Sequence, residues 1–494
     1  MSATERSQQV ERWGLFELAL PGPSQGNPFV EVELRTRFRH LHREVAVDGF
    51  YDGDGVYRVR FMPDVEGEWS YTTASNRSEL DGQTGVFSCV APAPDNHGHV
   101  QVHNTFHFSY ADGTPYRPFG TTCYAWTHQP QAVQAQTLRT LSTSPFNKLR
   151  MCVFPKYYTF NTADPDLFPF ERVGGGWDFA RFNPEFFRRF EQRVGDLLDL
   201  GSEADVILFH PYDQWGFARM GAEADARYVR YVVSRLAAYR NVWWSLANEY
   251  DLMDKPVSAW DRLFQIVQEH DPIQHLRSIH NWQRLDTHAC ETFYDHGKPW
   301  VTHCSIQHGH PDLAPTWRAQ YQKPVVLDEV CYEGDLPNGW GNVTGADLTH
   351  RFWQGIVGGG YVTHGETFLR PDDVIWWAKG GDLQGESPAR IAFLRRILED
   401  APSEGLDVVG EVTNTHLPST GQVGAFYLTY FGPRQPARVT LSLPEGQRYR
   451  ADLIDTWEMG VTPLTDSAQH GSTIHLPGKP YLTLRLRRIA SDPA

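Results

Sequence analysis

The stretch from Asn241 to Asp251, NVWWSLANEYD, constrains the fold more than any other part of the chain. Residues 242–247 form an apolar run after a helix-like segment, which is typical of a central parallel strand. The run ends in Asn248-Glu249, and α/β barrels place their chemistry where such strands end. The alternative is a glutamate that only caps the next helix. A second carboxylate in an equivalent place would decide between the two.

Eight candidate strands alternate with helical patterns in the middle of the chain. A typical helical segment begins with the N-cap and N1 pair Asn183-Pro184 and ends at Gly201. The pattern predicts a (β/α)8 TIM barrel over residues 97–400. A doubly wound open sheet is the structural competitor, and the lack of a GxGxxG or GxxxxGK[ST] loop after an early strand disfavours it. The strands are expected at 119–124, 148–154, 204–210, 241–248, 275–281, 300–306, 324–329 and 358–364.

Short alternating strands flank the barrel on both sides. Residues 1–96 contain runs such as LFELAL, FVEVELRTRF and VYRVRFMP, separated by turn residues and followed by a Pro-rich linker. Residues 401–494 return to the same pattern with GAFYLTYF, ARVTLSL and YLTLRLRR. We therefore predict an N-terminal and a C-terminal β-sandwich around the barrel.

Charge and cysteine usage exclude several classes of protein. The formal net charge of −15 argues against a nucleic-acid or anionic-membrane partner. No window approaches 18 consecutive apolar residues, and the first residues lack the apolar segment of a signal peptide. We interpret the six scattered cysteines as reduced core residues, which leads us to expect a cytoplasmic protein. A homo-oligomer stays open. The cysteines are Cys89, Cys123, Cys152, Cys290, Cys304 and Cys331.

The second carboxylate comes three βα steps later, in PVVLDE, where Glu329 ends the seventh predicted strand. Strands four and seven face one another across the mouth of a closed barrel, so Glu249 and Glu329 are expected to converge. A retaining glycosidase needs such a pair. We expect Glu249 to act as the acid/base, Glu329 as the nucleophile and Asn248 as a ligand of the sugar 2-OH.

The N-E after strand four and the E after strand seven resemble the pattern of clan A glycoside hydrolases. The stretches YADGTPYRPFGTTCYAW, NEYDLM and WWAKGGDLQGESPARIAFLRRIL are similar to a bacterial group of glycosidases with an added N-terminal sandwich. That group carries the domain-of-unknown-function labels 4038, 5060 and 5605, and apiosidase-type enzymes are its relatives. VDGFYDGDGVYRVRFMPDVEGEWSYTT resembles the 5060 module. The resemblance also implies that Arg150, within strand two, braces the nucleophile Glu329.

Polar and aromatic residues at the strand ends are further candidates for sugar contacts, because hydroxyl-rich ligands favour amide, imidazole and carboxylate partners above aromatic faces. For each of them a satisfied loop or core residue is the alternative interpretation. The candidate substrate-binding residues are Asn248, Arg150, His210, Asp213, Trp215, Tyr124, Trp126, Trp282, Gln307, His308, His364, Glu366 and Trp376.

The sequence thus predicts a retaining, exo-acting glycoside hydrolase on a short oligosaccharide or glycoside, with no cofactor and no metal. The run HCSIQHGH contains several histidines, but no H-E-x-x-H motif accompanies them. Two alternatives stay open. A transglycosylase would use the same two glutamates with a sugar acceptor, and a non-catalytic carbohydrate-binding protein would keep the fold without turnover.

Overall fold

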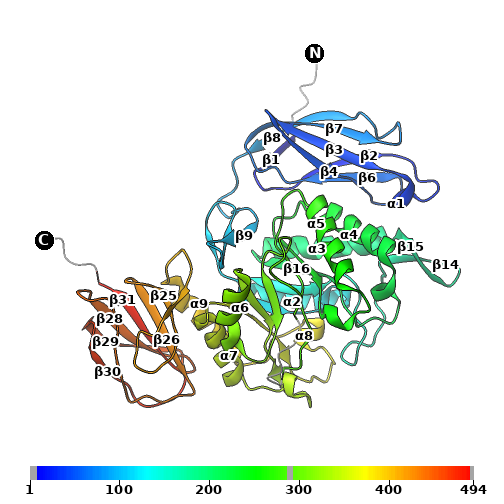
Figure 1. The fold of residues 1–494 in the computed structure, drawn as a ribbon. Helices are drawn as coiled ribbons and strands as arrows, with labels where there is room; N and C mark the ends of the chain where they lie inside the picture. The colour runs from blue at the N-terminus through cyan, green and yellow to red at the C-terminus, as the bar shows by residue number, and fades with distance from the viewer. Residues whose placement is uncertain (1–7, 286–292, 490–494) are drawn as a thin grey trace.

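A barrel of parallel strands forms the centre of the molecule, and a β-sandwich lies on either side of it (Figure 1). The computed structural model describes residues 8–285 and 293–489. The predicted architecture of a TIM barrel between two sandwiches is confirmed. No helix in the described ranges is long and apolar enough to cross a membrane.

The barrel strands follow one another around the ring in chain order, with β22 pairing to both β20 and β12. A parallel bridge between His280 and Ser305 joins the fifth strand to the sixth and closes the ring. All residues of these strands are buried, as expected for parallel strands covered by helices. The strands are β12 (Gly120–Thr122), β13 (Lys148–Cys152), β16 (Glu203–Phe209), β17 (Val242–Ala247), β18 (Arg277–Ser278), β19 (Cys304–Gln307), β20 (Val325–Glu329) and β22 (Tyr361–His364).

Helices cover the outside of the ring. The predicted start of α3 is confirmed, because the Asn183 side chain accepts a hydrogen bond from the Glu185 N–H and Pro184 stands at N1. The larger helices are α2 (Gln131–Thr143), α3 (Pro184–Asp199), α4 (Ala222–Leu236), α5 (Val257–His270), α6 (Ala314–Tyr321), α7 (Gly345–Val357) and α9 (Ser387–Glu399). The shorter elements of the barrel loops are η1 (Trp126–His128), β14 (Phe170–Val173), β15 (Gly176–Phe182), η2 (Phe217–Arg219), η3 (Tyr250–Leu252), η4 (Pro311–Leu313), β21 (Glu333–Gly334), η5 (Gly339–Gly341), β23 (Glu366–Thr367) and α8 (Trp376–Lys379).

Most barrel strands are shorter than the sequence pattern predicts. The last was expected from residue 358, but β22 begins at Tyr361. Gly359 has a φ of +76°, and a Cβ there would lie 1.9 Å from an Arg318 guanidinium nitrogen. The glycines therefore form the tight turn from α7 into the strand instead of extending it. The fifth and sixth strands are likewise trimmed, to Arg277–Ser278 and Cys304–Gln307.

A small antiparallel sheet precedes the first barrel strand and packs against the barrel. It consists of β9 (Val100–His103), β10 (His107–Tyr110) and β11 (Pro115–Tyr116). The ring of Phe108 lies 5.1 Å from that of Trp243 on β17, and Tyr116 lies 6.0 Å from the same indole. The sheet thus helps to bury Trp243 at the beginning of β17.

The N-terminal sandwich encloses its own aromatic core. Phe16, Phe38, Phe61, Trp69 and Phe87 are buried between its two sheets, which accounts for the period of two in the sequence. One sheet has the order β1 (Gln8–Glu11), β8 (Thr84–Val90), β7 (Gly67–Ser75), β3 (Leu34–His40) and β4 (Arg43–Asp48). The other has β2 (Phe16–Pro21), β6 (Val56–Phe61) and β5 (Phe50–Tyr51), with the short α1 (Pro28–Glu31) between β2 and β3.

The C-terminal sandwich pairs a six-stranded sheet with a two-stranded one around a separate apolar core. Two ion pairs from Asp400, just after α9, to Arg485 and Arg487 tie it to the end of the barrel region. The strands are β24 (Asp407–Gly410), β25 (Ser419–Gln422), β26 (Phe426–Gly432), β31 (Leu482–Arg488), β28 (Tyr449–Asp455) and β29 (Gly460–Ala468), and then β27 (Arg438–Thr440) and β30 (Thr473–His475).

The cysteines occur where the sequence interpretation expected them, in the core. Cys89, Cys123, Cys152, Cys304 and Cys331 are buried, and these five form no disulfide with one another. Cys290 lies outside the described residues.

A buried charge network joins the N-terminal sandwich to the barrel. Arg235 on α4 is buried and pairs with Asp52 of the sandwich at 2.8 Å, and it also pairs with Glu191 on α3. Arg60 on β6 reaches the same Glu191 at 2.8 Å. Burial alone raises the pKa of Asp52, but the Arg235 and Arg58 guanidinium groups outweigh it and lower that pKa below its usual value. The carboxylate is therefore held ionised at this interface.

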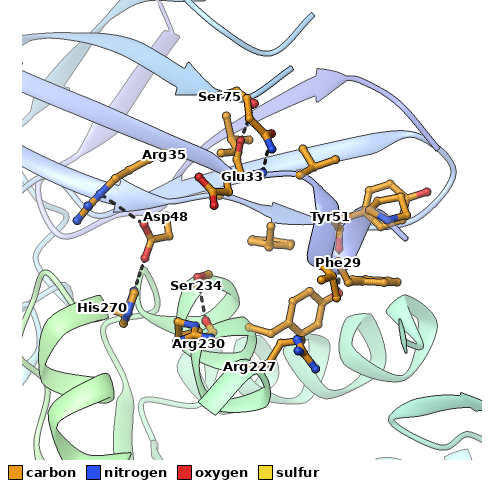
Figure 2. A pocket seen from close by; sticks show the side chains of 18 of the residues that line it. Phe29, Glu33, Arg35, Asp48, Tyr51, Ser75, Arg227, Arg230, Ser234 and His270 are labelled. Atoms are coloured by element: carbon orange, nitrogen blue, oxygen red, sulfur yellow. Dashed lines mark hydrogen bonds and ion pairs between the residues drawn. The ribbon is translucent and has the colours of Figure 1, made fainter. Parts of the chain in front are cut away.

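An open hollow lies beside this network, between the sandwich and helices α4 and α5 (Figure 2). Its volume is about 860 Å³. Arg35 pairs with Asp48 at 3.5 Å, and Asp48 also contacts His270 at the end of α5. These contacts fasten the edge of the sandwich to the barrel.

Replacing Asp52 by Ala is expected to lower the free energy of unfolding by about 3 kcal/mol, because it leaves a buried guanidinium short of one partner. Chemical denaturation measures the change. Asp166→Ala is the control, since that side chain is 78% exposed and its loss should leave stability almost unchanged. Equal stability of the two variants would contradict a role of Asp52 in holding the domains together.

Candidate active site

The backbone turns sharply where β17 ends, and this turn aims Glu249. Glu249 has φ 51° and ψ 54°, a left-handed conformation that is uncommon for a residue with a side chain. The Asn248 N–H donates to the Phe209 carbonyl at 2.9 Å, and the Tyr250 N–H donates to the His280 carbonyl at 3.0 Å. Neighbouring strands thus hold the strained turn in place, which is typical of functional sites.

Glu249 does not cap the helical turn that follows it. It stands at the N-cap position of η3, and its side chain makes no capping hydrogen bond. The alternative interpretation of the strand-end glutamate is therefore wrong. The carboxylate instead lines a cavity at the mouth of the barrel.

The Glu249 cavity also contains Glu329, the last residue of β20. Both glutamates are only 5% exposed, so each carboxylate has little water around it. The cavity has a volume of about 490 Å³. Its walls are largely aromatic and amide side chains, and it is lined by Tyr158, Thr159, Phe160, Tyr212, Glu249, Trp282, Gln283, Arg284, Leu285, Gln307, Glu329, Asn338, Gly339, Trp340 and Trp377.

A tyrosine hydroxyl contacts each glutamate. Tyr212, from the loop after β16, donates to Glu249. Tyr124, after β12, contacts Glu329 and lies 2.9 Å from the Asn248 Oδ1 atom. Asn248 and Tyr124 thus belong to the wall behind the cavity and position Glu329. The Asn248 Nδ2 atom, in contrast, has no hydrogen-bond partner among the described residues.

The two glutamates differ in what stabilises their charge. Burial, followed by the charge of Glu329, raises the pKa of Glu249 to about 8. Burial also raises the pKa of Glu329, but the Tyr124 hydrogen bond and the charges of Lys156 and Arg150 oppose that shift. Glu329 therefore has more groups that favour its anion, and Glu249 is the better candidate to carry a proton at neutral pH.

The expected ion pair between Arg150 and Glu329 is replaced by another. The Arg150 guanidinium pairs with Asp328 at 3.0 Å and with Asp205 at 3.4 Å, both inside the barrel. Asp328 lies at the level of Arg150 and also pairs with Lys148 at 2.9 Å, whereas Glu329 follows an irregularity in the register between β19 and β20. The guanidinium still reaches the site through the Asn248 Oδ1 atom, at 3.1 Å.

Beyond Asn248, Arg150 and Tyr124, two of the predicted sugar ligands line the cavity, namely Trp282 and Gln307. The other eight lie outside its lining and have contacts within the protein, so a sugar contact for them stays a prediction. Three of the eight illustrate the contacts: Asp213 accepts from the N–H groups of its own loop, His308 packs on Trp317, and Trp126 is fully buried beside Met151. The eight are His210, Asp213, Trp215, Trp126, His308, His364, Glu366 and Trp376.

Sequence reasoning missed most of the aromatic wall. The ring centroids of Trp340, Tyr158 and Phe160 lie 5.2, 5.4 and 5.6 Å, respectively, from the ring centroid of Trp377. These residues come from long loops after β13, β20 and β22, several positions beyond the strand ends. Only their aromatic character could have signalled them, and aromatic residues are common throughout this chain.

One buried group in the described ranges combines metal-ligating side chains, namely Glu333, His364 and Glu366. Glu333 accepts hydrogen bonds from the Glu386 and Ser387 N–H groups at the start of α9, at 2.7 and 3.0 Å. Glu366 accepts from the Gln384 N–H at 2.7 Å. The carboxylates therefore fasten the loop before α9.

Comparison with known proteins agrees with this fold. The family model of an apiosidase-like catalytic domain matches residues 102–402, and two domains of unknown function, 5060 and 5605, match residues 9–76 and 416–487. No curated protein matches the chain.

Solved structures extend the comparison. A candidate glycoside hydrolase from Bacteroides vulgatus ATCC 8482 is 40% identical with a TM-score of 0.90, over 98% of this chain and 100% of that one. A family 5 glycoside hydrolase from the same organism is 14% identical, with a TM-score of 0.62 over 81% and 95% of the two chains, and so shares the fold. The chain therefore belongs to the family of the apiosidase-like catalytic domain, and it is a glycosidase.

Proposed function

We propose that this glycosidase is a retaining enzyme that removes a terminal sugar by double displacement. The observation that carries the proposal is the pair of buried glutamates, Glu249 and Glu329, on the walls of one cavity. Two carboxyl groups that share a site but differ in protonation supply both an acid and a nucleophile.

In the first half-reaction, a Glu329 oxygen attacks the anomeric carbon as the bond from that carbon to the leaving oxygen breaks. Glu249 delivers its proton to the leaving oxygen. The result is a glycosyl ester on Glu329 and an ionised Glu249. The Asn248 Nδ2 donor, which lacks a partner among the described residues, is suited to hold the sugar 2-OH during this step.

In the second half-reaction, the Glu249 carboxylate takes a proton from a water molecule as the water oxygen attacks the anomeric carbon. The bond to Glu329 breaks, and the glutamate leaves as a carboxylate. Both groups return to their starting protonation. Two displacements at one carbon retain its configuration.

The size of the cavity supports action at a chain end. About 490 Å³ is within the range of sites for small ligands, and it does not suit a long polysaccharide. Trp282, Trp340 and Trp377 offer apolar faces on which sugar rings stack, while Gln307 and Asn338 offer amide groups for hydroxyls. We therefore expect short oligosaccharides or glycosides as substrates.

Replacing Glu329 by Ala should lower kcat/KM at least about 10⁴-fold on every glycoside that the wild type cleaves. Glu249→Ala should lower it about 10²- to 10⁴-fold with poor leaving groups, and much less with dinitrophenyl leaving groups that need no proton. A panel of nitrophenyl glycosides of both anomers and both ring sizes finds the working substrate.

The control for these variants is Glu223→Gln, at a side chain that is 88% exposed and outside the cavity, and it should retain wild-type activity. Proton NMR of the first-formed product tests the stereochemistry. Retention of the anomeric configuration is expected, and inversion would overturn the double displacement. Full activity of both glutamate variants would contradict the assignment of the active site.

The pH dependence follows from the pKa of Glu249 near 8. The first half-reaction needs Glu249 protonated and Glu329 ionised. We therefore expect kcat/KM to fall as the pH rises through about 8. It should also fall at low pH, through a value above 4.5, because the pKa of Glu329 is raised. A basic limb that is unchanged in Glu249→Gln would contradict the assignment of the acid.

The same pKa predicts a change in stability. A carboxyl group whose pKa is higher in the folded state favours folding fully below its unfolded pKa, near 4.5, and that contribution is lost as the pH rises through about 8. Glu249→Gln has no such loss. Its Tm relative to wild type should therefore rise by a few degrees between pH 5 and pH 8, measured calorimetrically, whereas Glu223→Gln should show no such trend. A constant difference would contradict the raised pKa.

A further inference from the structure

Lys156 is a buried cation beside the two glutamates, and neither half-reaction above uses it. It follows β13 in the chain and is only 2% exposed. Within the ranges that the structure describes, its ammonium group forms neither a hydrogen bond nor an ion pair, although burying a charge without a partner is costly. The amide of Asn161 holds the backbone, by donating to the Lys156 carbonyl at 2.6 Å.

Aromatic rings surround the ammonium group instead. The Lys156 Nζ atom lies 3.7 Å from the centroid of the Tyr124 ring, 4.3 Å from that of Tyr212, 4.6 Å from that of Tyr158 and 5.4 Å from that of Trp377. Each ring presents negative π density to the cation, and such contacts are stronger where water is excluded. The rings hold the charge in place without neutralising it.

Two of these rings belong to the tyrosines that contact the catalytic pair. Tyr124 contacts Glu329, and Tyr212 donates to Glu249. One cation therefore lies against both tyrosines. Its charge lowers the pKa of both carboxyl groups. The other ionisable groups around it are Arg150, Cys152, Tyr158, His210 and His280.

We propose that Lys156 is a positioning residue that balances the single negative charge of the catalytic pair throughout the reaction. The inference rests on the proposed function, because that mechanism moves the charge. In the free enzyme the charge is on Glu329. After the glycosyl ester forms, the charge is on Glu249, and hydrolysis returns it to Glu329.

A fixed cation near both glutamates stabilises the negative charge on either one, so no other charged group has to move when the charge passes between them. A cation hydrogen-bonded to one glutamate would favour one half-reaction over the other. The aromatic cage avoids such a bias, because it fixes the ammonium group by ring contacts and leaves it free of a dedicated carboxylate partner. Burial lowers the pKa of Lys156, whereas Cys152 and the two glutamates oppose that change.

A purely structural role is the competing explanation, in which Lys156 only fills the space between the rings. The two explanations differ in what they predict for Lys156→Met, which keeps the length of the side chain and removes its charge. A filler would leave the titration of the glutamates unchanged. A charge-balancing cation would hold both pKa values down, so its removal should raise both.

The test is a carbon-13 NMR titration of the carboxyl groups in full-length protein with labelled glutamate. The Glu249 and Glu329 signals are assigned with Glu249→Gln and Glu329→Gln. In Lys156→Met we expect both pKa values to rise by about one unit, and both limbs of the pH profile of kcat/KM to move with them. Lys156→Arg, which keeps the charge, should stay near wild type.

Lys298→Met is the matched control. Lys298 pairs with Asp261 outside the cavity, so its loss should leave both glutamate pKa values unchanged. If Lys156→Met fails to fold by circular dichroism, Lys156→Gln takes its place. Unshifted glutamate pKa values in a folded, uncharged variant overturn the inference. The titration needs no substrate, so it tests the role of Lys156 independently of activity. A wild type that is inactive on every glycoside would contradict the proposed function instead.

Discussion

Closure of the barrel is the constraint on which the site depends. Eight parallel strands form a complete ring only because the short β18 reaches β19 through the bridge from His280 to Ser305. The ring brings the ends of β17 and β20 to one mouth, although three βα units separate them in the chain. An open sheet would leave Glu249 and Glu329 apart, and each would then be an ordinary exposed strand-end carboxylate.

The neighbours of the two buried glutamates make their pKa values unequal. Removing water raises both pKa values. The tyrosine, arginine and lysine neighbours lower the two pKa values again by different amounts. Glu329 has more anion-stabilising neighbours than Glu249. The same low-polarity surroundings make Lys156 effective, since a charge acts over a longer distance where water is excluded.

Much of the fold could be predicted from the sequence, because the periodic patterns are local. The apolar run before Asn248-Glu249 and the Asn183-Pro184 helix start were both interpreted correctly. The strand was predicted to begin at residue 358, which is too early, because the glycines before Tyr361 form the turn that precedes it. The proposed domain boundaries at residues 96 and 400 remain predictions.

The surroundings of the candidate site were less predictable. Arg150 was assigned to Glu329, and the structure pairs it with Asp328, one residue away in sequence. Trp376 was preferred to its neighbour Trp377, which is the one that lines the cavity. A shift of one position turns a side chain to another face of a helix or strand, so spacing alone separates such neighbours poorly.

The sequence by itself determined the eight βα units, the two flanking sandwiches and the pair of strand-end glutamates, since each of these is a local pattern of apolar period and turn chemistry. Only the tertiary structure decided which loops close over those glutamates. It placed Tyr124, Tyr212 and Lys156 together from three separate loops, and it formed the aromatic wall from the Lys156 loop and two further loops. The physical reason is that loops carry no period. Their side chains meet only because the ring of strands brings the loop ends to one face.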